Sequence, residues 1–296
     1  MESQSLKYVV GIGEVLWDML PDGKKLGGAP ANFSYHVSQF GLPGCAVSAV
    51  GEDALGEEII ANLLDKDLDF SIDKVSYPTG TVEVCLDAAG VPQYDITENA
   101  AWDNIPFTPE LDALAHRTRA VCFGSLAQRS EVSRNTIRRF LDAMGEDSLV
   151  VFDINLRQHF YSEEVITDSM RRCNILKIND EELEIVSRML ELSTSDVDAK
   201  CRRLMERFDL KILILTCGVN GSYVFTPDAH YFLPTPIVKV ADTVGAGDSF
   251  TAAFVASLLK GKSVEEAHAT AVETSAYVCS QHGAMPCLPH SLTSGA

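Results

Sequence analysis

The sequence of 296 residues lacks features that would assign it to several large classes of protein. No apolar run approaches the roughly 20 residues that cross a membrane, so we expect neither a transmembrane helix nor a membrane partner. The N-terminus has no basic segment followed by an apolar one, which predicts no secretory signal and a cytoplasmic location.

Basic residues are also few, with 24 Lys and Arg against 42 Asp and Glu and a net charge of −18. An acidic field repels the phosphates of nucleic acids and anionic lipids, so we expect no nucleic-acid partner. The eight cysteines never form a C-x-x-C pair. Most of them lie in apolar stretches, which favours buried reduced thiols over disulfides or a zinc site.

Apolar runs alternate with amphipathic segments along most of the chain. We predict strands at Tyr8–Ile12, Ala46–Val50, Ala120–Phe123, Leu149–Asp153, Ile175–Ile178 and Ile212–Thr216. We predict helices at Asn32–Phe40, Leu55–Lys66, Val132–Met144, Glu163–Cys173 and Asp196–Phe208. This alternation predicts a single α/β domain over residues 1–296, with a mostly parallel sheet that binds ligands at the carboxyl ends of its strands.

One region departs from this pattern. The segment Thr79–Asn104 has alternating residues, a turn at Gly90 and little helical periodicity, which predicts a hairpin of two strands. Together with Val15–Leu20 it would form a small sheet that stands off the main body.

The stretch DTVGAGDSF, residues 242–250, is the most informative motif. The small residues Gly245, Ala246 and Gly247 let successive backbone N–H groups point into one space, and the helix that follows adds its positive dipole end. An anion suits this place, whereas Asp248 would repel it. The acid makes sense as a base that takes a proton from an attacking hydroxyl, although an Asp that only caps a helix fits these nine residues equally well.

A second glycine-rich helix entry, GGAPANF, lies about two hundred residues earlier. Gly28 would allow close backbone approach and Asn32 would contact hydroxyls, although the segment alone is typical of a simple helix start. The two motifs in this order resemble the ribokinase-like (pfkB) family of sugar kinases, which has GG-x-x-x-N early and DT-x-GAGD late. The resemblance covers essentially the whole chain.

The resemblance implies an ATP-dependent kinase with a three-layer α/β/α core and a small β lid, formed here by about 15–22 and 79–105. In this family the lid closes over the sugar and often builds a homodimer. The segment GE-x-LWD, followed by LGGAPANF, is most similar to bacterial fructokinases and assigns sugar hydroxyls to Asp18. For Glu14, a sugar contact and a surface turn remain equally open.

The stretch DINLRQHF follows a buried strand and carries Asn155 and Arg157. A guanidinium there suits a transferring phosphoryl group or a substrate oxyanion, whereas pairing with a nearby acid is the structural alternative. Fructokinase-like sequences have a comparable D-x-N-x-R, which favours the functional interpretation for both residues. Asp153 is interpreted as structural.

The stretch KINDEELEIV places Asn179 and Glu182 three residues apart at a helix start, where an amide and a carboxylate share one face. The family's N-x-x-E motif assigns them to magnesium-bound water beside the phosphates. An acidic helix start is otherwise explained by the helix dipole alone.

The remaining assignments concern the nucleotide. Thr216 and Gly218, in ILTCGVNGS, would border its phosphates, with a tight hairpin as the alternative that fits Gly221. In the family, the stretch corresponding to Val272–Pro286 flanks adenine and, with Asp242 and Val244, encloses a monovalent cation, here K⁺.

We therefore expect a fructokinase that phosphorylates the 6-hydroxyl with ATP and Mg²⁺. Ribose, 2-keto-3-deoxygluconate and a nucleoside are alternative substrates, and a non-catalytic sugar-binding regulator is the alternative from another class. An intact Asp248 argues against the regulator. A dinucleotide-binding dehydrogenase is excluded because Leu16 stands where the third glycine of Gly11-x-Gly13 should be.

Overall fold

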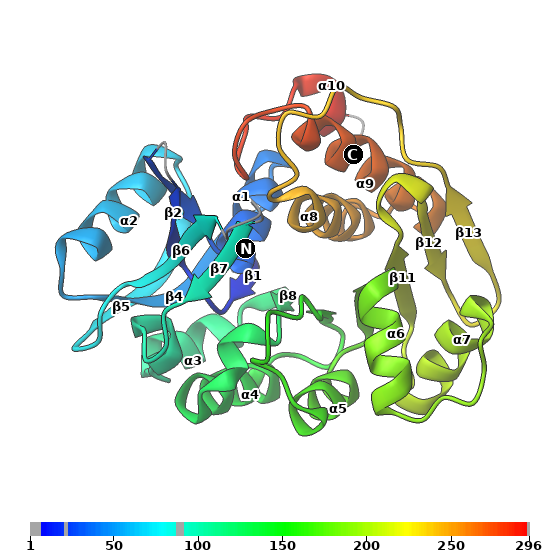
Figure 1. The fold of residues 1–296 in the computed structure, drawn as a ribbon, viewed down its shortest axis with the longest axis horizontal. Helices are drawn as coiled ribbons and strands as arrows, with labels where there is room; N and C mark the ends of the chain where they lie inside the picture. The colour runs from blue at the N-terminus through cyan, green and yellow to red at the C-terminus, as the bar shows by residue number, and fades with distance from the viewer. Residues whose placement is uncertain (1–6, 21–22, 87–91, 295–296) are drawn as a thin grey trace, which may run out of the picture.

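The computed structural model describes residues 7–20, 23–86 and 92–294. It has two sheets, a large one in the body and a small one beside it (Figure 1). The strands of the large sheet are β1 (Tyr8–Ile12), β4 (Gly44–Gly51), β5 (Asp69–Val75), β8 (Thr118–Phe123), β9 (Leu149–Asp153), β10 (Ile175–Asn179), β11 (Ile212–Thr216), β12 (Ser222–Phe225) and β13 (His230–Leu233).

The large sheet runs in the order β13-β12-β11-β10-β9-β8-β1-β4-β5. Every neighbouring pair from β11 to β5 is parallel. Strands β12 and β13 extend it as an antiparallel hairpin. Helices α1 to α7 lie between the strands along the chain, and α8 to α10 follow the last strand. The helices are α1 (Ala29–Gln39), α2 (Ala54–Asp65), α3 (Pro109–Ala115), α4 (Glu131–Ala143), α5 (Glu163–Arg172), α6 (Asp180–Met189), α7 (Val197–Phe208), α8 (Ala246–Leu259), α9 (Val264–Cys279) and α10 (His290–Thr293).

Helices cover both faces of this sheet and give three layers. One face packs against α1, α8 and α9, through side chains such as Phe33, Phe254 and Ala271. The other face packs against α3 to α7, for example through Phe140 and Met170. Figure 1 shows α8 and α9 on one side of the sheet and α3, α4 and α5 on the other. No described helix is both long enough and apolar enough to span a membrane.

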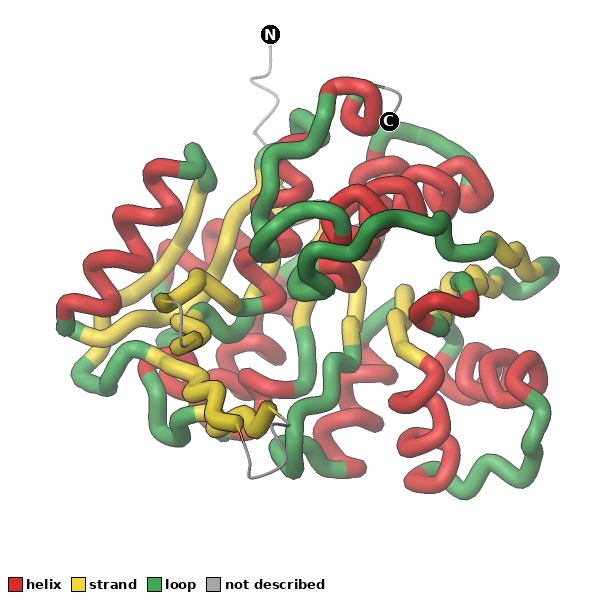
Figure 2. The backbone as a smooth tube through the Cα atoms, turned by 45° about the horizontal axis from the view of Figure 1, so that its top comes forward, coloured by secondary structure: helices red, strands yellow, loops and turns green. Residues whose placement is uncertain are grey.

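The small sheet contains β2 (Leu16–Leu20), β3 (Gly23–Gly27), β6 (Gly80–Leu86) and β7 (Pro92–Ile96), in the order β3-β2-β6-β7. In Figure 2 it lies in front of the body, separate from the long strands. Its root is fixed by Asp53, the N-cap of α2. The Asp53 carboxylate accepts hydrogen bonds from Thr79 N at 2.8 Å and from Thr79 Oγ1 at 2.7 Å.

The predicted elements agree closely with the structure. All six predicted strands and all five predicted helices exist, and their ends differ by at most three residues at any terminus. The hairpin at Thr79–Asn104 is also confirmed as β6 and β7, but its Gly90 turn lies outside the described residues. Strand β3 was not predicted, because its sequence GKKLG has no alternation of apolar and polar residues.

The strand pattern of the small sheet predicts an apolar face with Val82, Val84 and Leu86 that a homodimer covers. For Val82 this is wrong, since it is 6% exposed within the chain and belongs to the core cluster that includes Leu16 and Trp102. Burial in the same chain explains this valine without a second subunit.

Candidate functional site

The N-terminus of α8 meets the carboxyl ends of β9 and β10. Gly245 precedes the helix with φ 78°, and a Cβ atom at this position would lie 2.7 Å from the carbonyl oxygen of Ala284. Only glycine therefore suits the turn. Within the described part of the chain no side chain caps this helix, and Ala246 N donates to the carbonyl oxygen of Thr243 at 3.3 Å, so the N–H groups of Gly247 and Asp248 are left to bind an anion.

The two glycine-rich motifs come together at this helix. Asn32 Nδ2 donates a hydrogen bond of 2.8 Å to Asp248 Oδ2, across 216 residues of sequence. Gly28 sets the entry into α1 with φ 116°, and a Cβ atom there would lie 2.4 Å from the carbonyl oxygen of Glu14. The turn that brings Asn32 to Asp248 thus requires a glycine at position 28.

Asp248 is partly exposed at the N-terminus of α8, and desolvation of its carboxylate raises its pKa from the usual 3.8 to about 6. The hydrogen bond from Asn32 and the charges of Lys177 and Arg157 oppose this rise, while Asp153 adds to it. A carboxylate whose pKa lies near neutrality accepts a proton more readily than an ordinary aspartate and is still ionised at pH 7. The contacts do not support Asp248 as a helix cap, because its carboxylate accepts a hydrogen bond from Asn32 and no side chain caps α8 among the described residues.

Glu14 lies beside this base. It is 4% exposed, and burial raises its pKa from 4.5 to about 7, against the lowering effect of Arg157. Its Oε2 atom has no hydrogen-bond partner among the described residues. The surface-turn interpretation of Glu14 is therefore wrong, and the carboxyl group faces the interior of the site.

Asp18 and Arg157 lie close enough to interact electrostatically. Asp18 lies on β2, and burial raises its pKa while the charge of Arg157 lowers it. Arg157 is exposed and donates to the carbonyl oxygen of Leu156 at 3.1 Å. It forms no ion pair with any carboxylate of the described residues within 4.0 Å, so the structural alternative for this arginine is not supported.

Asn155 adopts a left-handed conformation with φ 47° at the end of β9. Asparagine tolerates this conformation better than most residues, and such outliers gather at functional sites. Its carbonyl oxygen accepts a bond of 3.4 Å from Ser125 Oγ.

Asn179 and Glu182 form a capping box at the start of α6. Asn179 Oδ1 accepts from Glu182 N at 2.8 Å, and Glu182 Oε2 accepts from Asn179 N at 2.9 Å. Glu182 Oε1 accepts from Leu156 N at 2.9 Å. Because both carboxylate oxygens are already engaged and Glu182 is 5% exposed, this residue fits Mg²⁺ through an intervening water and not as a direct ligand.

The residues predicted to border the nucleotide lie at the ends of the neighbouring strands β10 and β11. Thr216 ends β11 opposite Asn179 in register, and Gly218 begins a short 3₁₀ turn, Gly218–Asn220, which leads into β12. The hairpin alternative is thereby confirmed for Gly221, while Thr216 and Gly218 remain at the same sheet edge as Asn179. Among the described residues no three His, Cys, Asp or Glu side chains form a group that could hold a metal directly.

Asp242 and Val244 lie in the loop before α8. Asp242 Oδ1 accepts from Val244 N at 3.1 Å, and Asp242 Oδ2 accepts from Gly283 N at 3.2 Å. The ammonium group of Lys25 lies 3.9 Å from Oδ2. A cation already faces this carboxylate, so the residues present do not fit K⁺ unless Lys25 moves away.

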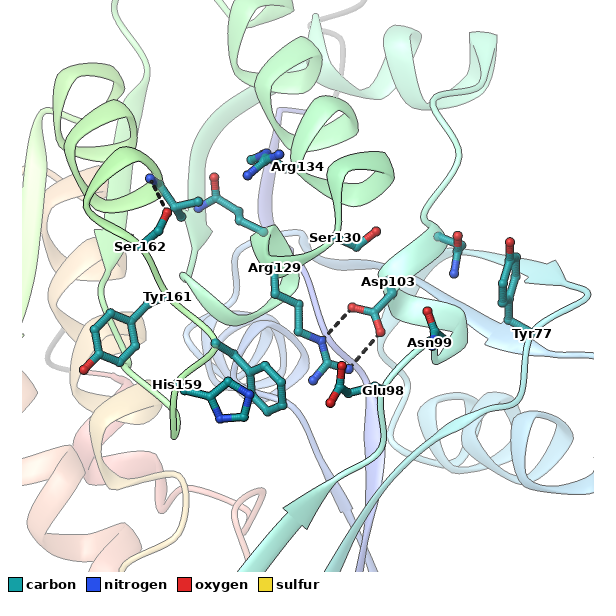
Figure 3. A pocket seen from close by; sticks show the side chains of 14 residues that line it. Tyr77, Glu98, Asn99, Asp103, Arg129, Ser130, Arg134, His159, Tyr161 and Ser162 are labelled. Carbon is teal, nitrogen blue, oxygen red and sulfur yellow. Dashed lines mark hydrogen bonds and ion pairs between the residues drawn. The ribbon is translucent and has the colours of Figure 1, made fainter.

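A cavity of about 460 Å³ lies at the root of the small sheet and includes none of the predicted site residues (Figure 3). Arg129 points to Asp103 in its wall, with Nε–Oδ1 at 2.9 Å and Nη2–Oδ2 at 2.8 Å. Trp102 and Phe160 stack on the same guanidinium, at 4.1 and 4.4 Å from the ring centres. This cluster joins the small sheet to the turn after β8 and carries no chemistry of its own.

Two residues at the base of the site were missed as functional candidates. Lys177 Nζ is bound to Asp153 Oδ1 at 3.0 Å, beneath the N-terminus of α8. The signal was a lysine inside the otherwise apolar strand ILKIN, where a charged side chain requires a buried partner.

Three layers, a mostly parallel sheet and an uncapped glycine turn beside a buried acid define a phosphate-handling α/β enzyme. The model of the "pfkB family carbohydrate kinase" matches residues 22–291, and the chain belongs to this family. It is an ATP-dependent sugar kinase, and both the predicted family and the predicted fold class are confirmed.

Relatives and solved structures cover nearly the entire chain. "Probable fructokinase-2" of Arabidopsis thaliana is 28% identical over 310 residues, which is 95% of this chain and 92% of the relative. The crystal structure of a fructokinase with bound ATP from Xylella fastidiosa has a TM-score of 0.84 at 22% identity, with 98% of each chain covered. A fructokinase double mutant from Vibrio cholerae, bound to fructose, ADP and potassium, has a TM-score of 0.81 at 22% identity, with 99% of each chain covered.

Proposed function

We propose that this sugar kinase transfers the terminal phosphoryl group of ATP to the 6-hydroxyl of fructose, giving fructose 6-phosphate and ADP. The observation that carries the proposal is the contact between Asn32 and Asp248 at the uncapped N-terminus of α8. At this contact, an amide that can bind hydroxyls lies beside a carboxylate that can act as a base, next to a site for an anion. The fructokinases among the relatives support fructose as the acceptor.

Asp248 acts as the general base. Its oxygen receives the proton of the sugar hydroxyl as that hydroxyl attacks phosphorus, and the attacking and leaving oxygens stay in line. A pKa of about 6 leaves the carboxylate ionised at neutral pH and makes it more basic than an ordinary aspartate.

The turn Gly245–Gly247 binds the phosphoryl oxygens through the backbone N–H groups of the first turn of α8. These dipoles are fixed before the reaction, so no reorganisation is needed as charge develops. The exposed guanidinium of Arg157, which has no carboxylate partner among the described side chains, is available to the same oxygens.

Asp18, Asn32, Gly28 and Asn155 hold the sugar. The carboxylate of Asp18 accepts hydrogen bonds from two hydroxyls, Asn32 and Asn155 offer amide groups, and Gly28 permits close backbone approach. The raised pKa of Asp18 reflects burial, which outweighs the lowering effect of Arg157 and Lys25, and sugar hydroxyls would offset the burial by donating to the carboxylate.

ATP lies along the ends of β10 and β11, with its phosphates near Asn179, Thr216 and Gly218. Exposed apolar side chains on the neighbouring loops suit an adenine ring, namely Val219, Ile237 and Val240. Mg²⁺, when bound by the phosphates, would neutralise their charge and meet Glu182 through water. We propose no role for K⁺ in the transfer itself, because Lys25 faces Asp242.

The small sheet would act as a lid that closes when sugar binds and keeps water from the phosphoryl group. We further propose that the chain is a single kinase domain, works in the cytoplasm and forms a homodimer through this sheet. Hydrogen exchange with and without fructose, together with light scattering, tests these points. Exchange over residues 79–104 that ignores fructose would contradict the lid, and a mass near 32.2 kDa would contradict the dimer.

A coupled assay of ADP release tests the substrate. Fructose, ribose, glucose, 2-keto-3-deoxygluconate and adenosine are compared at equal concentration with ATP and Mg²⁺, and fructose should give the highest kcat/KM. Faster turnover of another acceptor would reject fructose and keep the kinase. Sugar binding without ADP release from any acceptor would favour the non-catalytic regulator.

A further inference from the structure

The sheet beneath α8 contains a buried ion pair, on β9 and β10, next to the turn that precedes Asp248. Asp153 and Lys177 are register partners on these strands, and their side chains are 7% and 10% exposed. Lys177 Nζ and Asp153 Oδ1 are 3.0 Å apart. An ion pair this deeply buried is not explained by stability alone, because desolvation offsets most of the attraction.

Both members of the pair touch the first turns of α8. Asp153 Oδ2 accepts a hydrogen bond of 3.2 Å from Thr251 Oγ1, one turn beyond Asp248. Thr251 Oγ1 also donates to the carbonyl oxygen of Gly247 at 3.0 Å. Lys177 Nζ lies 3.0 Å from the position that a Cβ atom on Gly247 would take. The ammonium group therefore lies directly under the anion-binding turn.

We propose that Asp153 and Lys177 are positioning residues for phosphoryl transfer, which hold the turn Gly245–Asp248 on the sheet and place two opposite charges beneath it. This inference rests on the proposed role of Asp248. It replaces the interpretation of Asp153 as a purely structural residue.

The two charges act on Asp248 in opposite directions. Asp153 raises the pKa of Asp248 and Lys177 lowers it, on top of the rise that burial causes. The groups that face Asp248 from the surrounding elements are Glu14 after β1, Asn32 on α1, Cys122 on β8, Asp153 on β9, Arg157 in the following loop and Lys177 on β10. Of these, Asp153 and Lys177 are the oppositely charged pair joined to each other.

The test is a titration of Asp248 by NMR in protein labelled with ¹³C at the aspartate carboxyl carbons. The Asp248 signal is the one absent from Asp248→Asn, and the wild-type midpoint should be about 6. Asp153→Asn should lower the midpoint and Lys177→Gln should raise it, each by roughly one pH unit, the usual effect of a nearby charge. Lys177→Arg keeps the charge and should return the midpoint towards the wild type.

Two matched variants control for general effects of removing a paired charge. Asp168→Asn removes a carboxylate that binds Arg138 and Arg172, and Lys200→Gln removes a buried lysine paired with Glu184. Neither should move the Asp248 midpoint. The proposal would be overturned by Asp248 midpoints that stay fixed, or that move the same way in Asp153→Asn and Lys177→Gln. If the pair had a purely structural role, the two variants would have lower melting temperatures and an unchanged midpoint.

Because the titration needs neither sugar nor ATP, its outcome is separate from that of the kinase assay. An enzyme inactive with every acceptor would overturn the proposed function and leave the measured midpoints valid. If Lys177→Gln does not fold, the Asp153→Asn arm decides the matter, because the amide keeps both the shape and an acceptor for Lys177.

Discussion

Two regions of this molecule remove carboxylates from solvent and give them different partners. At the root of the small sheet, Asp103 is 4% exposed and receives two hydrogen bonds from Arg129 and one of 3.0 Å from Ala100 N. At the N-terminus of α8, the partly exposed Asp248 receives a hydrogen bond from the neutral amide of Asn32, and Glu14 beside it is 4% exposed. Glu14 has one oxygen with no partner among the described residues.

The difference in hydrogen-bond partners distinguishes a carboxylate with a structural role from a carboxylate that can act on a ligand. A carboxylate whose oxygens already accept hydrogen bonds from a stacked guanidinium has no acceptor position left for a ligand. A buried carboxylate with few partners costs stability, and its raised pKa marks a place where a substrate completes the interactions. The cavity of about 460 Å³ lies beside the first kind of carboxylate, so a cavity alone does not point to the proposed catalytic site.

Asp248→Asn gives the largest expected effect. The amide cannot accept the hydroxyl proton, so kcat should fall by about 10²–10⁴, the usual contribution of general base catalysis. Because the wild-type acid has a raised pKa of about 6, its ionisation costs stability at pH 7, and the variant should melt at the same or a higher temperature. More than a tenth of wild-type turnover would show that Asp248 is not the base.

Arg129→Met tests the other region. It leaves Asp103 buried without its cation and removes a donor to the carbonyl oxygen of Thr97, so the free energy of unfolding should fall by about 3–5 kcal/mol. Arg138→Met, which removes a more exposed ion pair with Asp168, should cost about 1 kcal/mol or less. Denaturant unfolding of both variants measures the difference, and equal losses would refute the contrast drawn here.

Glu14→Gln should change the pH dependence of stability. The folded pKa of about 7 lies above the ordinary 4.5, so protonated Glu14 favours the folded state at low pH. That stability is lost as the pH rises through 7, by about 1.4 kcal/mol for each unit between the two values. In thermal melts from pH 5 to pH 9, the melting temperature of the variant should rise relative to that of the wild type up to about pH 7. A difference in melting temperature that is the same at every pH would contradict the assigned pKa.

Asp18→Ala should have the smallest effect. Loss of hydrogen bonds from a carboxylate to two hydroxyls should raise KM for fructose by about 10-fold or more and leave KM for ATP nearly unchanged. Glu83→Ala, at an exposed position on the same small sheet, is the control and should alter neither constant. Equal changes in both constants for Asp18→Ala would place Asp18 outside the sugar site.

The motif residues could be predicted because their chemistry is local. Gly245 and Gly28 form turns that are recognisable within short motifs of nine and seven residues. The alternation of strands and helices then places both turns at one edge of the sheet. The contact of Asn32 with Asp248 follows from that topology. Roles for these residues remain predictions until the variants are measured.

Other features could not be predicted because they depend on distant partners. The pairing of Lys177 with Asp153 requires the register of β10 on β9, which no local pattern reveals. Asn179 and Glu182 each accept a hydrogen bond from the backbone N–H of the other. The same N-x-x-E spacing also suits a site for magnesium-bound water, so the sequence alone does not distinguish the two. Burial of Val82 likewise depends on the packing of the small sheet against Trp102.

The pH dependence of kcat/KM for fructose tests the central claim most directly, because it reports on the base in the free enzyme. The account predicts a plateau above about pH 7 and a tenfold fall per pH unit below about pH 6, while circular dichroism shows that the protein stays folded. A profile that remains flat down to pH 5 in folded protein would contradict a role for Asp248 as the base.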